Sequence, residues 1–167
     1  METVGKRSHL TCECTTLVDT EQIRLTMDEV NYLRLIHILF RVACPVVRMR
    51  FNHEIHPDQL RRTLDKNKLE INKNYRMKRT IFDDYQWHLL FGHSKVTSED
   101  FGIRLMTYLL HIIANIDVSD LYPVHTDTSI GAMLSRIKFI RNDVTQSLEG
   151  YLTKDQFSKY WDDIGQV

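Results

Sequence analysis

Arg141, Asn142 and Gln146 are the residues whose types and spacing come closest to a catalytic motif in this sequence. An arginine can clamp phosphate oxygens with its planar fork of N–H donors. A histidine about one helical turn later could move the proton of a ribose hydroxyl near neutral pH, so such a pair could handle a phosphodiester. Here the later position holds glutamine, whose amide has no titrating proton. The segment could therefore belong to an RNA-cleaving domain, to a disarmed relative of one, or to neither.

Helical geometry limits how these side chains can act together. On an ideal helix, positions 141 and 146 lie about 140° apart, whereas positions 142 and 146 share a face. Arg141 and Gln146 would converge only if the helix bends near position 145 or if a second subunit contributes. A structural alternative is that Arg141 orients the last helix by pairing with a carboxylate, and a dimer contact is a third interpretation. The candidate carboxylates are Asp143, Asp162 and Asp163.

The first half of the chain predicts helices joined by short loops, because only six glycines and three prolines occur in 167 residues. Thr26 and Glu29 form a predicted capping box that opens a helix. Its expected apolar stripe is Val30, Leu33, Ile36, His37 and Phe40. Pro45 is expected to end or kink this helix. His56-Pro57 predicts the next helix start, followed by the inward-facing Leu60 and Leu64.

Between these helices and the motif, residues 66–78 are polar and lysine-rich, which predicts a solvent-facing segment or a connection. Residues 81–91 form an aromatic-rich short element that Gly92 stops. Thr97 or Ser98 is predicted to cap a long helix. Its expected buried side is Phe101, Leu105, Tyr108, Leu109, Ile112 and Ile113. Residues 117–126, with Pro123, are expected to form a loop.

The motif lies on the helix that follows, which Thr126 or Asp127 is expected to start and Gly150 to close. The expected apolar face of this helix is Ile130, Met133, Leu134, Ile137, Ile140, Val144 and Leu148. Thr153 and Gln156 form another capping box. They open a last helix with the apolar residues Phe157, Tyr160, Trp161 and Ile164. Because no cap precedes Val167, the chain is expected to be cut within or just after this helix.

These patterns predict an all-α fold, since no strand-like alternation is found. Residues 1–25 are expected to be a loosely ordered lead-in, and residues 26–167 the helical domain. The odd number of cysteines, three, favours a reducing cytosol. Arg34, His37 and Arg41 interrupt the longest apolar run, and the N-terminus has no apolar signal region. We therefore expect a cytoplasmic protein that does not contact a membrane.

The net charge of zero conceals an uneven distribution. Residues 41–79 contain eleven Lys or Arg residues against four acidic residues, a net charge of +7, whereas residues 80–167 have a net charge of −5. A basic helical hairpin could dock on the acidic remainder, or it could face phosphates. If it faces phosphates, the RNA-binding candidates besides Arg141 are Arg61, Arg62, Lys66, Arg76, Lys78 and Arg79.

No metal site and no cofactor are predicted. His9, Cys12 and Cys14 lack the fourth ligand that structural zinc needs. The histidine pairs at positions 53 and 56 and at positions 88 and 93 are interpreted as capping and packing residues. Neither a phosphate-binding loop nor a dinucleotide-binding fingerprint occurs.

An ordered set of short pieces resembles a known family. The pieces are Tyr32-Leu33-Arg34-Leu35, Pro45-Val46-Val47-Arg48 with Phe51, His56-Pro57 with Leu60 and Leu64, Gln86-Trp87, Leu89-Leu90-Phe91, Ser98-Glu99-Asp100-Phe101-Gly102, Leu105, Leu109-Leu110, Asn115-Ile116, Ile137, Ile140-Arg141-Asn142, Phe157 and Trp161-Asp162-Asp163-Ile164. Over roughly residues 27–167 the chain is similar to the HEPN domains of the type found in the DAZ-interacting zinc-finger (RING) ubiquitin ligase and its invertebrate relatives.

This resemblance implies an up-and-down helical bundle with additional short helices. Many HEPN domains are metal-independent RNases whose arginine and histidine are completed across a dimer. By this resemblance Arg141 is the motif arginine, Asn142 is its polar neighbour, and Gln146 occupies the place of the histidine, so catalysis is expected to be lost.

The expected function is therefore a helical interaction and self-association module with a degenerate RNase motif, in a larger cytosolic protein related to innate immunity or to ubiquitin ligases. The alternative is an RNA-binding domain or weak metal-independent endoribonuclease that acts through Arg141 at a dimer interface. The expected partners are a second copy or another HEPN-like helical domain, and RNA in the alternative.

Overall fold

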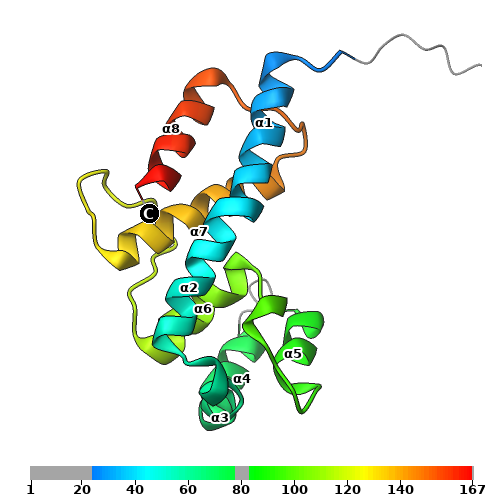
Figure 1. Cartoon of the computed structure of the whole chain (residues 1–167), viewed down its shortest axis with the longest axis vertical. Coiled ribbons are helices and arrows are strands. Elements are labelled where there is room, and N and C mark those ends of the chain that lie inside the picture. The colour runs from blue at the N-terminus through cyan, green and yellow to red at the C-terminus, as the bar shows by residue number, and fades with distance from the viewer. Residues whose placement is uncertain (1–23, 78–82, 167) are drawn as a thin grey trace, which may run out of the picture.

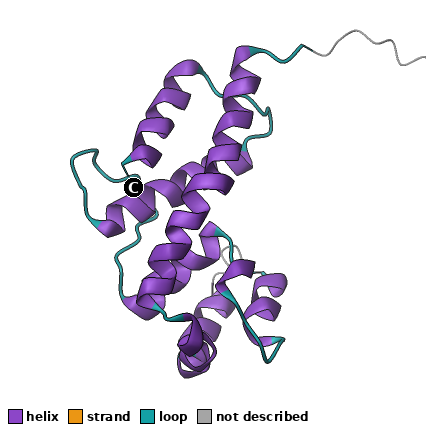
Figure 2. Ribbon diagram, in the orientation of Figure 1, coloured by secondary structure: helices purple, strands orange, loops and turns teal. Residues whose placement is uncertain are grey.

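The computed structural model describes residues 24–77 and 83–166, and every regular element in this part of the chain is a helix (Figure 1, Figure 2). The elements are α1 (Met27–Ile38), η1 (Leu39–Ala43), α2 (Cys44–Glu54), η2 (Pro57–Gln59), α3 (Leu60–Lys66), α4 (Lys68–Met77), α5 (Asp84–Phe91), η3 (Ser98–Asp100), α6 (Ile103–Ala114), α7 (Ile130–Gln146) and α8 (Lys154–Gly165). The all-α prediction is confirmed. The predicted lead-in lies almost entirely outside the described residues.

The first two helices run into one another through the π-helical turn η1 (Figure 1). The predicted capping box of Thr26 and Glu29 opens α1. Buried positions then recur every four residues, at Asn31, Leu35, Leu39 and Ala43. This spacing exceeds the 3.6 residues of an α-helical turn, so the buried stripe would drift around a regular helix. The wider turn offsets this drift and keeps Cys44, Val47 and Phe51 on the core side.

The helix does not end at Pro45, because this proline follows the π turn in the first turn of α2, where a missing N–H is tolerated. The predicted stripe is misplaced, since Leu33, His37 and Phe40 are exposed. Apolar residues occur on several sides of α1, so periodicity alone does not identify the side that packs on its neighbours.

The continuous helix from Met27 to Glu54 is long and apolar enough to cross a membrane by length and composition. The expectation that its basic residues exclude such a span is therefore wrong. One third of its most apolar stretch is buried in the bundle, and the core helix of a globular domain can have the same composition.

The core lies where α6 packs on α2, α7 packs on α6 and α8, and α8 packs on α1. Phe51 of α2 and Phe101 meet edge to face with their ring centroids 5.8 Å apart. Leu60 and Leu64 are buried as predicted. The lysine-rich segment after them is not a connection but the helix α4, whose Ile71 is fully buried. Helices α3, α4 and α5 gather at one end of the molecule (Figure 1).

Several helix ends differ from the predicted ones. Thr97 caps the short η3, and α6 begins only after Gly102. Ser129, rather than an earlier residue, caps α7 through a hydrogen bond from the backbone N–H of Ala132. This helix ends at Gln146, so Leu148 is fully exposed in the loop that follows. The capping box at the start of α8 is confirmed.

A buried arginine on α7 ties the loop of residues 115–129 to the bundle. Arg136 is 0% exposed, and its Nη2 donates to the carbonyls of Val124 at 2.6 Å, His125 at 3.2 Å and Asp127 at 2.7 Å. Its Nε lies 3.9 Å from Oδ1 of Asp163 on α8. Arg136 therefore joins α7, the loop and α8, a role that the sequence analysis did not assign to it.

Candidate functional site

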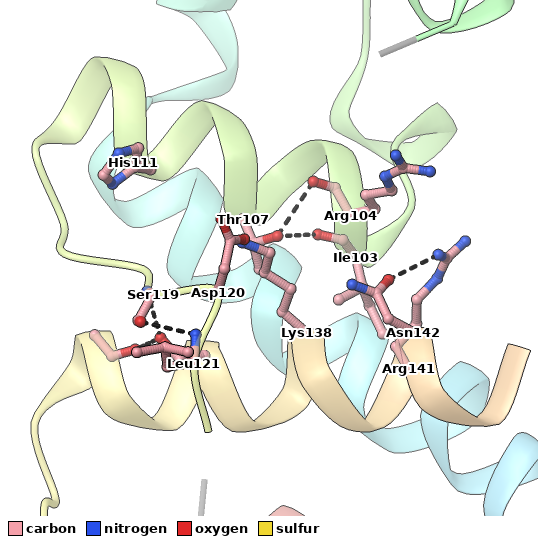
Figure 3. Close-up of polar contacts among 12 residues, drawn as sticks. Ile103, Arg104, Thr107, His111, Ser119, Asp120, Leu121, Lys138, Arg141 and Asn142 are labelled. Carbon is pink, nitrogen blue, oxygen red and sulfur yellow. Dashed lines mark hydrogen bonds and ion pairs between the residues drawn. The ribbon is translucent and has the colours of Figure 1, made fainter. Parts of the chain in front are cut away.

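Helix α7 presents Lys138, Arg141 and Asn142 on the flank beside α6 (Figure 3). Ile137 and Ile140 are fully buried and fix the rotation of α7 in the core. Residues three and four positions apart lie on one helix face, so Lys138 lies beside both Arg141 and Asn142. Because Ile137 and Ile140 point into the core, Lys138, Arg141 and Asn142 lie on the polar side of α7.

Arg141 is half-buried and does not make the ion pair that the structural alternative predicts. Its Nη1 donates to Oδ1 of Asn142 at 3.0 Å. Asp143 instead accepts a hydrogen bond from Tyr160 at 2.7 Å, and Asp163 accepts one from Tyr122. Burial, and then the positive charge of Arg104, lowers the pKa of the Arg141 guanidinium. Arg141 thus lies beside a like charge and, within the described residues, forms no ion pair.

Gln146 faces a different part of the surface. It is exposed at the last position of α7 and lines a shallow cavity with Tyr32, Asp143 and Gln156. Asn142, one turn earlier, lines the groove between α6 and α7. The face that positions 142 and 146 were expected to share does not bring them into one cavity. The structure therefore keeps Arg141 and Asn142 together and separates both from Gln146.

The groove between α6 and α7 has a volume of about 180 Å³. Its lining residues come from α4, α6, the following loop and α7, and they are Asn74, Arg104, Thr107, Tyr108, His111, Ile112, Val118, Asp120, Lys138 and Asn142. Lys138 and Asp120 form an ion pair across it at 2.6 Å. Burial, and then the charge of Glu70, raises the pKa of Tyr108 to about 12, so its phenol stays neutral at physiological pH.

His111 contributes an imidazole to this groove that the sequence analysis overlooked. Its Nδ1 lies 3.0 Å from the carbonyl oxygen of Ile116. A carbonyl only accepts, so Nδ1 carries the hydrogen, and in the neutral ring Nε2 is left as an acceptor. Thr107 and His111 are four positions apart on α6, a spacing that indicates a shared face. The histidine is far from Arg141 in sequence, so a search near the motif does not find it.

The described cations of the basic stretch of residues 41–79 have different surroundings. Arg61 pairs with Asp65 at 2.7 Å and donates to the carbonyl of Leu90 at 2.6 Å, so it ties α3 to α5. Arg62 and Lys66 are exposed on α3. Three further candidates have side chains outside the described part of the chain, and they are Arg76, Lys78 and Arg79.

Three of the histidines in the two pairs, His56, His88 and His93, make capping or packing contacts. Nδ1 of His56 accepts from the backbone N–H of Asp58, and the rings of His88 and His93 meet edge to face with centroids 4.7 Å apart. No group of three or more His, Cys, Asp or Glu residues that could hold a metal occurs within residues 24–77 and 83–166. His9, Cys12 and Cys14, which the sequence analysis rejected as a zinc site, lie outside these ranges.

The fold and the arginine-bearing helix define a helical-bundle domain of the HEPN class. The model of the family described as DZIP3/hRUL138-like HEPN matches residues 57–167, more than half of the chain, and the chain belongs to this family. The matched region includes Arg141, Asn142 and Gln146, whereas α1, η1 and α2 precede it. Comparisons with curated proteins and with solved structures gave no significant match.

Proposed function

We propose that this HEPN domain acts by association rather than catalysis, as a self-association module of a larger cytosolic protein related to innate immunity or ubiquitin ligation. The observation that carries the proposal is Leu148, which is 100% exposed two residues after Gln146. Removing a leucine side chain from water contributes about 1.5–3 kcal/mol. We expect a second copy to cover this leucine in the loop after α7.

Other apolar side chains lie at the same end of the molecule. The backbone N–H of Leu152 donates to the carbonyl of Asp28 at 3.0 Å, which holds the loop after α7 beside the start of α1. Tyr151 of this loop and Met27 of α1 are both exposed. Apolar residues grouped on one surface favour an interface more than a single exposed leucine does.

The absence of a titrating side chain at position 146 supports a non-catalytic role. General acid–base catalysis is typically worth about 10²–10⁴-fold in rate, and a glutamine cannot supply it. Gln146 also lines a different cavity from Asn142. We therefore expect the purified chain to leave single-stranded RNA uncleaved.

Light scattering coupled to size-exclusion chromatography tests self-association. We expect a dimer that Leu148→Glu dissociates, because a carboxylate cannot be buried there without a partner. Leu69→Glu is the matched control, since Leu69 is 86% exposed on α4, away from this end. A wild-type chain that stays monomeric at high concentration would refute the proposed self-association.

A second candidate function is RNA binding or weak endoribonuclease activity through Arg141 at a dimer interface. It is favoured by the half-buried guanidinium of Arg141, which lies beside Arg104 and donates to no carboxylate among the described residues. Binding through phosphates should weaken steeply as salt is added. Arg141→Ala should reduce both binding and any cleavage, and a lack of binding at low salt would eliminate this candidate.

A further inference from the structure

The long helix formed by α1, η1 and α2 runs along most of the length of the molecule and keeps one side exposed (Figure 1). Its buried positions recur every four residues from Asn31 to Phe51. Positions two residues after them lie about 200° away on a regular helix, so they face outward. This outward side consists of six exposed residues, which are Leu33, His37, Arg41, Pro45, Met49 and His53.

Exposed apolar side chains lie on the outward side and next to it. Phe40 is 64% exposed and Met49 is 73% exposed, while Leu33 and Val42 are each half-exposed. These residues contribute to an apolar character that the core does not use, since only a third of the most apolar stretch of this helix is buried. Apolar side chains grouped on one surface favour an interface.

The outward side is also positively charged. Residues 30–53 contain four arginines and no acid. Two of the arginines are held by neighbours, because Arg48 donates to a carbonyl of η3 at 3.0 Å and Arg50 pairs with an acid one turn later. Arg34 and Arg41 are exposed, and within residues 24–77 and 83–166 they form no ion pair. These two cations are placed to attract an anionic partner.

The mixture of charged and apolar residues fits a wet, anionic surface better than a dry protein interface. Arg41 lies near the middle of the outward side, so a symmetric pair of copies would bring Arg41 against Arg41. A dry interface with another protein would strip water from this guanidinium unless an acid met it there. At a bilayer surface, apolar side chains enter the acyl-chain boundary while arginines stay hydrated among the headgroups.

We propose that the outward side of α1, η1 and α2 binds peripherally to an anionic lipid surface. The helix lies on this surface and does not cross it, because α2 packs on α6 and α1 packs on α8. Lipid binding goes beyond self-association and does not require it, since one chain supplies the whole outward side. It departs from the expectation that the chain does not contact a membrane.

Co-sedimentation with vesicles tests the proposal, with phosphatidylcholine alone and with a mixture of phosphatidylcholine and phosphatidylserine. The chain should bind the anionic vesicles, bind the neutral ones much more weakly, and dissociate as salt is added. Arg34→Gln and Arg41→Gln should each weaken binding to the anionic vesicles about fivefold, the effect of losing about 1 kcal/mol per cation. Phe40→Ala should weaken it about tenfold, because an inserted ring is lost.

Arg62→Gln is the matched control, because Arg62 is exposed on α3 and should leave binding unchanged. Circular dichroism should show the same helical content for every variant. A second readout places the contact on the outward side. Brominated lipids should quench the tryptophan that Phe40→Trp adds, and should not quench the one that Tyr85→Trp adds on α5, where Tyr85 is 69% exposed.

Three results would overturn the proposal. A lack of binding to anionic vesicles at low salt would exclude a lipid surface and leave an acidic protein segment as the occupant. Equal losses of binding in Arg62→Gln and Arg41→Gln would show a general attraction of the chain's cations, without a contact at the outward side. A wild-type dimer that Phe40→Glu dissociates and Leu148→Glu does not would assign the outward side to a second copy.

Discussion

Arg136→Met should destabilise the fold more than any substitution of an exposed charge. Methionine fills much of the aliphatic volume of arginine but supplies no hydrogen-bond donor. Three loop carbonyls would lose the donor Nη2, at 2.6–3.2 Å, and Asp163 would lose its nearest buried cation. Asp163 is 3% exposed, so water cannot replace that cation without local opening.

The expected magnitude follows from these contacts. Removing one partner of a buried ion pair costs about 3–5 kcal/mol, because the other charge stays buried without compensation. Tyr122 still donates to Asp163, which favours the lower part of this range. For a chain of this size, about 1 kcal/mol shifts the melting temperature by roughly 2–4 °C, so we expect a decrease of about 6–12 °C.

Thermal unfolding followed by circular dichroism measures this effect. Arg62→Met is the matched control, because Arg62 is exposed on α3 and its loss should change stability by no more than about 0.5 kcal/mol. Adding Asp163→Asn to Arg136→Met should restore part of the loss, since it removes the uncompensated charge. A decrease of less than about 2 °C for Arg136→Met, or no recovery in the double variant, would refute the argument that this pair ties α7 to α8.

Three further predictions concern single hydrogen bonds and backbone conformations. The backbone N–H and hydroxyl of Thr26 donate to Glu29 at 2.6 and 2.8 Å, which lowers the pKa of Glu29 below its ordinary value of 4.5. Stability from this contact is therefore present above pH 4.5 and lost as pH falls through the lowered pKa, so Glu29→Gln should melt with less dependence on pH between 5 and 3 than the wild type. Tyr160→Phe should cost about 1–2 kcal/mol in urea unfolding, because it removes the 2.7 Å hydrogen bond to Asp143, and an unchanged midpoint would contradict this. Asn115 ends α6 with φ 55°, so Asn115→Ala should lose about 1 kcal/mol while Asn115→Gly should not, and equal melting temperatures for the two would argue against strain there.

Local signals in the sequence predicted the starts of α1 and α8, although the starts of α6 and α7 lie later than predicted. The capping boxes at Thr26 and Thr153 each need only residues three positions apart, so no tertiary contact can hide them. The same reasoning placed His56-Pro57 at the start of η2 and Gly92 at the end of α5. The free backbone N–H and C=O groups at helix ends need hydrogen-bond partners whatever the helix packs against, so local sequence is enough to predict these features.

The packed faces and the groove were harder to predict. Leu35 of α1 and Leu39 of η1 are buried where Leu33 and Phe40 are not, because contact of α1 with α8 and of η1 with α7 decides among several apolar sides. His111 belongs to the groove only because α6 and α7 lie side by side. The count of basic residues likewise did not reveal that Arg61 forms an ion pair with Asp65.

Arg141 and Gln146 lie apart on α7. The substitution Gln146→His therefore tests whether an RNA-cleaving site would need residues from one chain or from two. Positions 141 and 146 lie about 140° apart on α7, and Asn142 and Gln146 line different cavities. A histidine at position 146 is therefore not placed to reach a phosphate held by Arg141 of its own chain, but it could meet Arg141 of a second copy.

Any RNA cleavage that Gln146→His gains should then rise more steeply than linearly with protein concentration. It should disappear when Leu148→Glu is added, whereas Leu69→Glu should leave it intact. Cleavage by a monomeric Gln146→His, Leu148→Glu chain would show that α7 can complete the site alone, and the role of the second copy in catalysis would have to be abandoned. Self-association itself would still be judged by the light scattering of the wild-type chain, because a domain can dimerise without cleaving RNA.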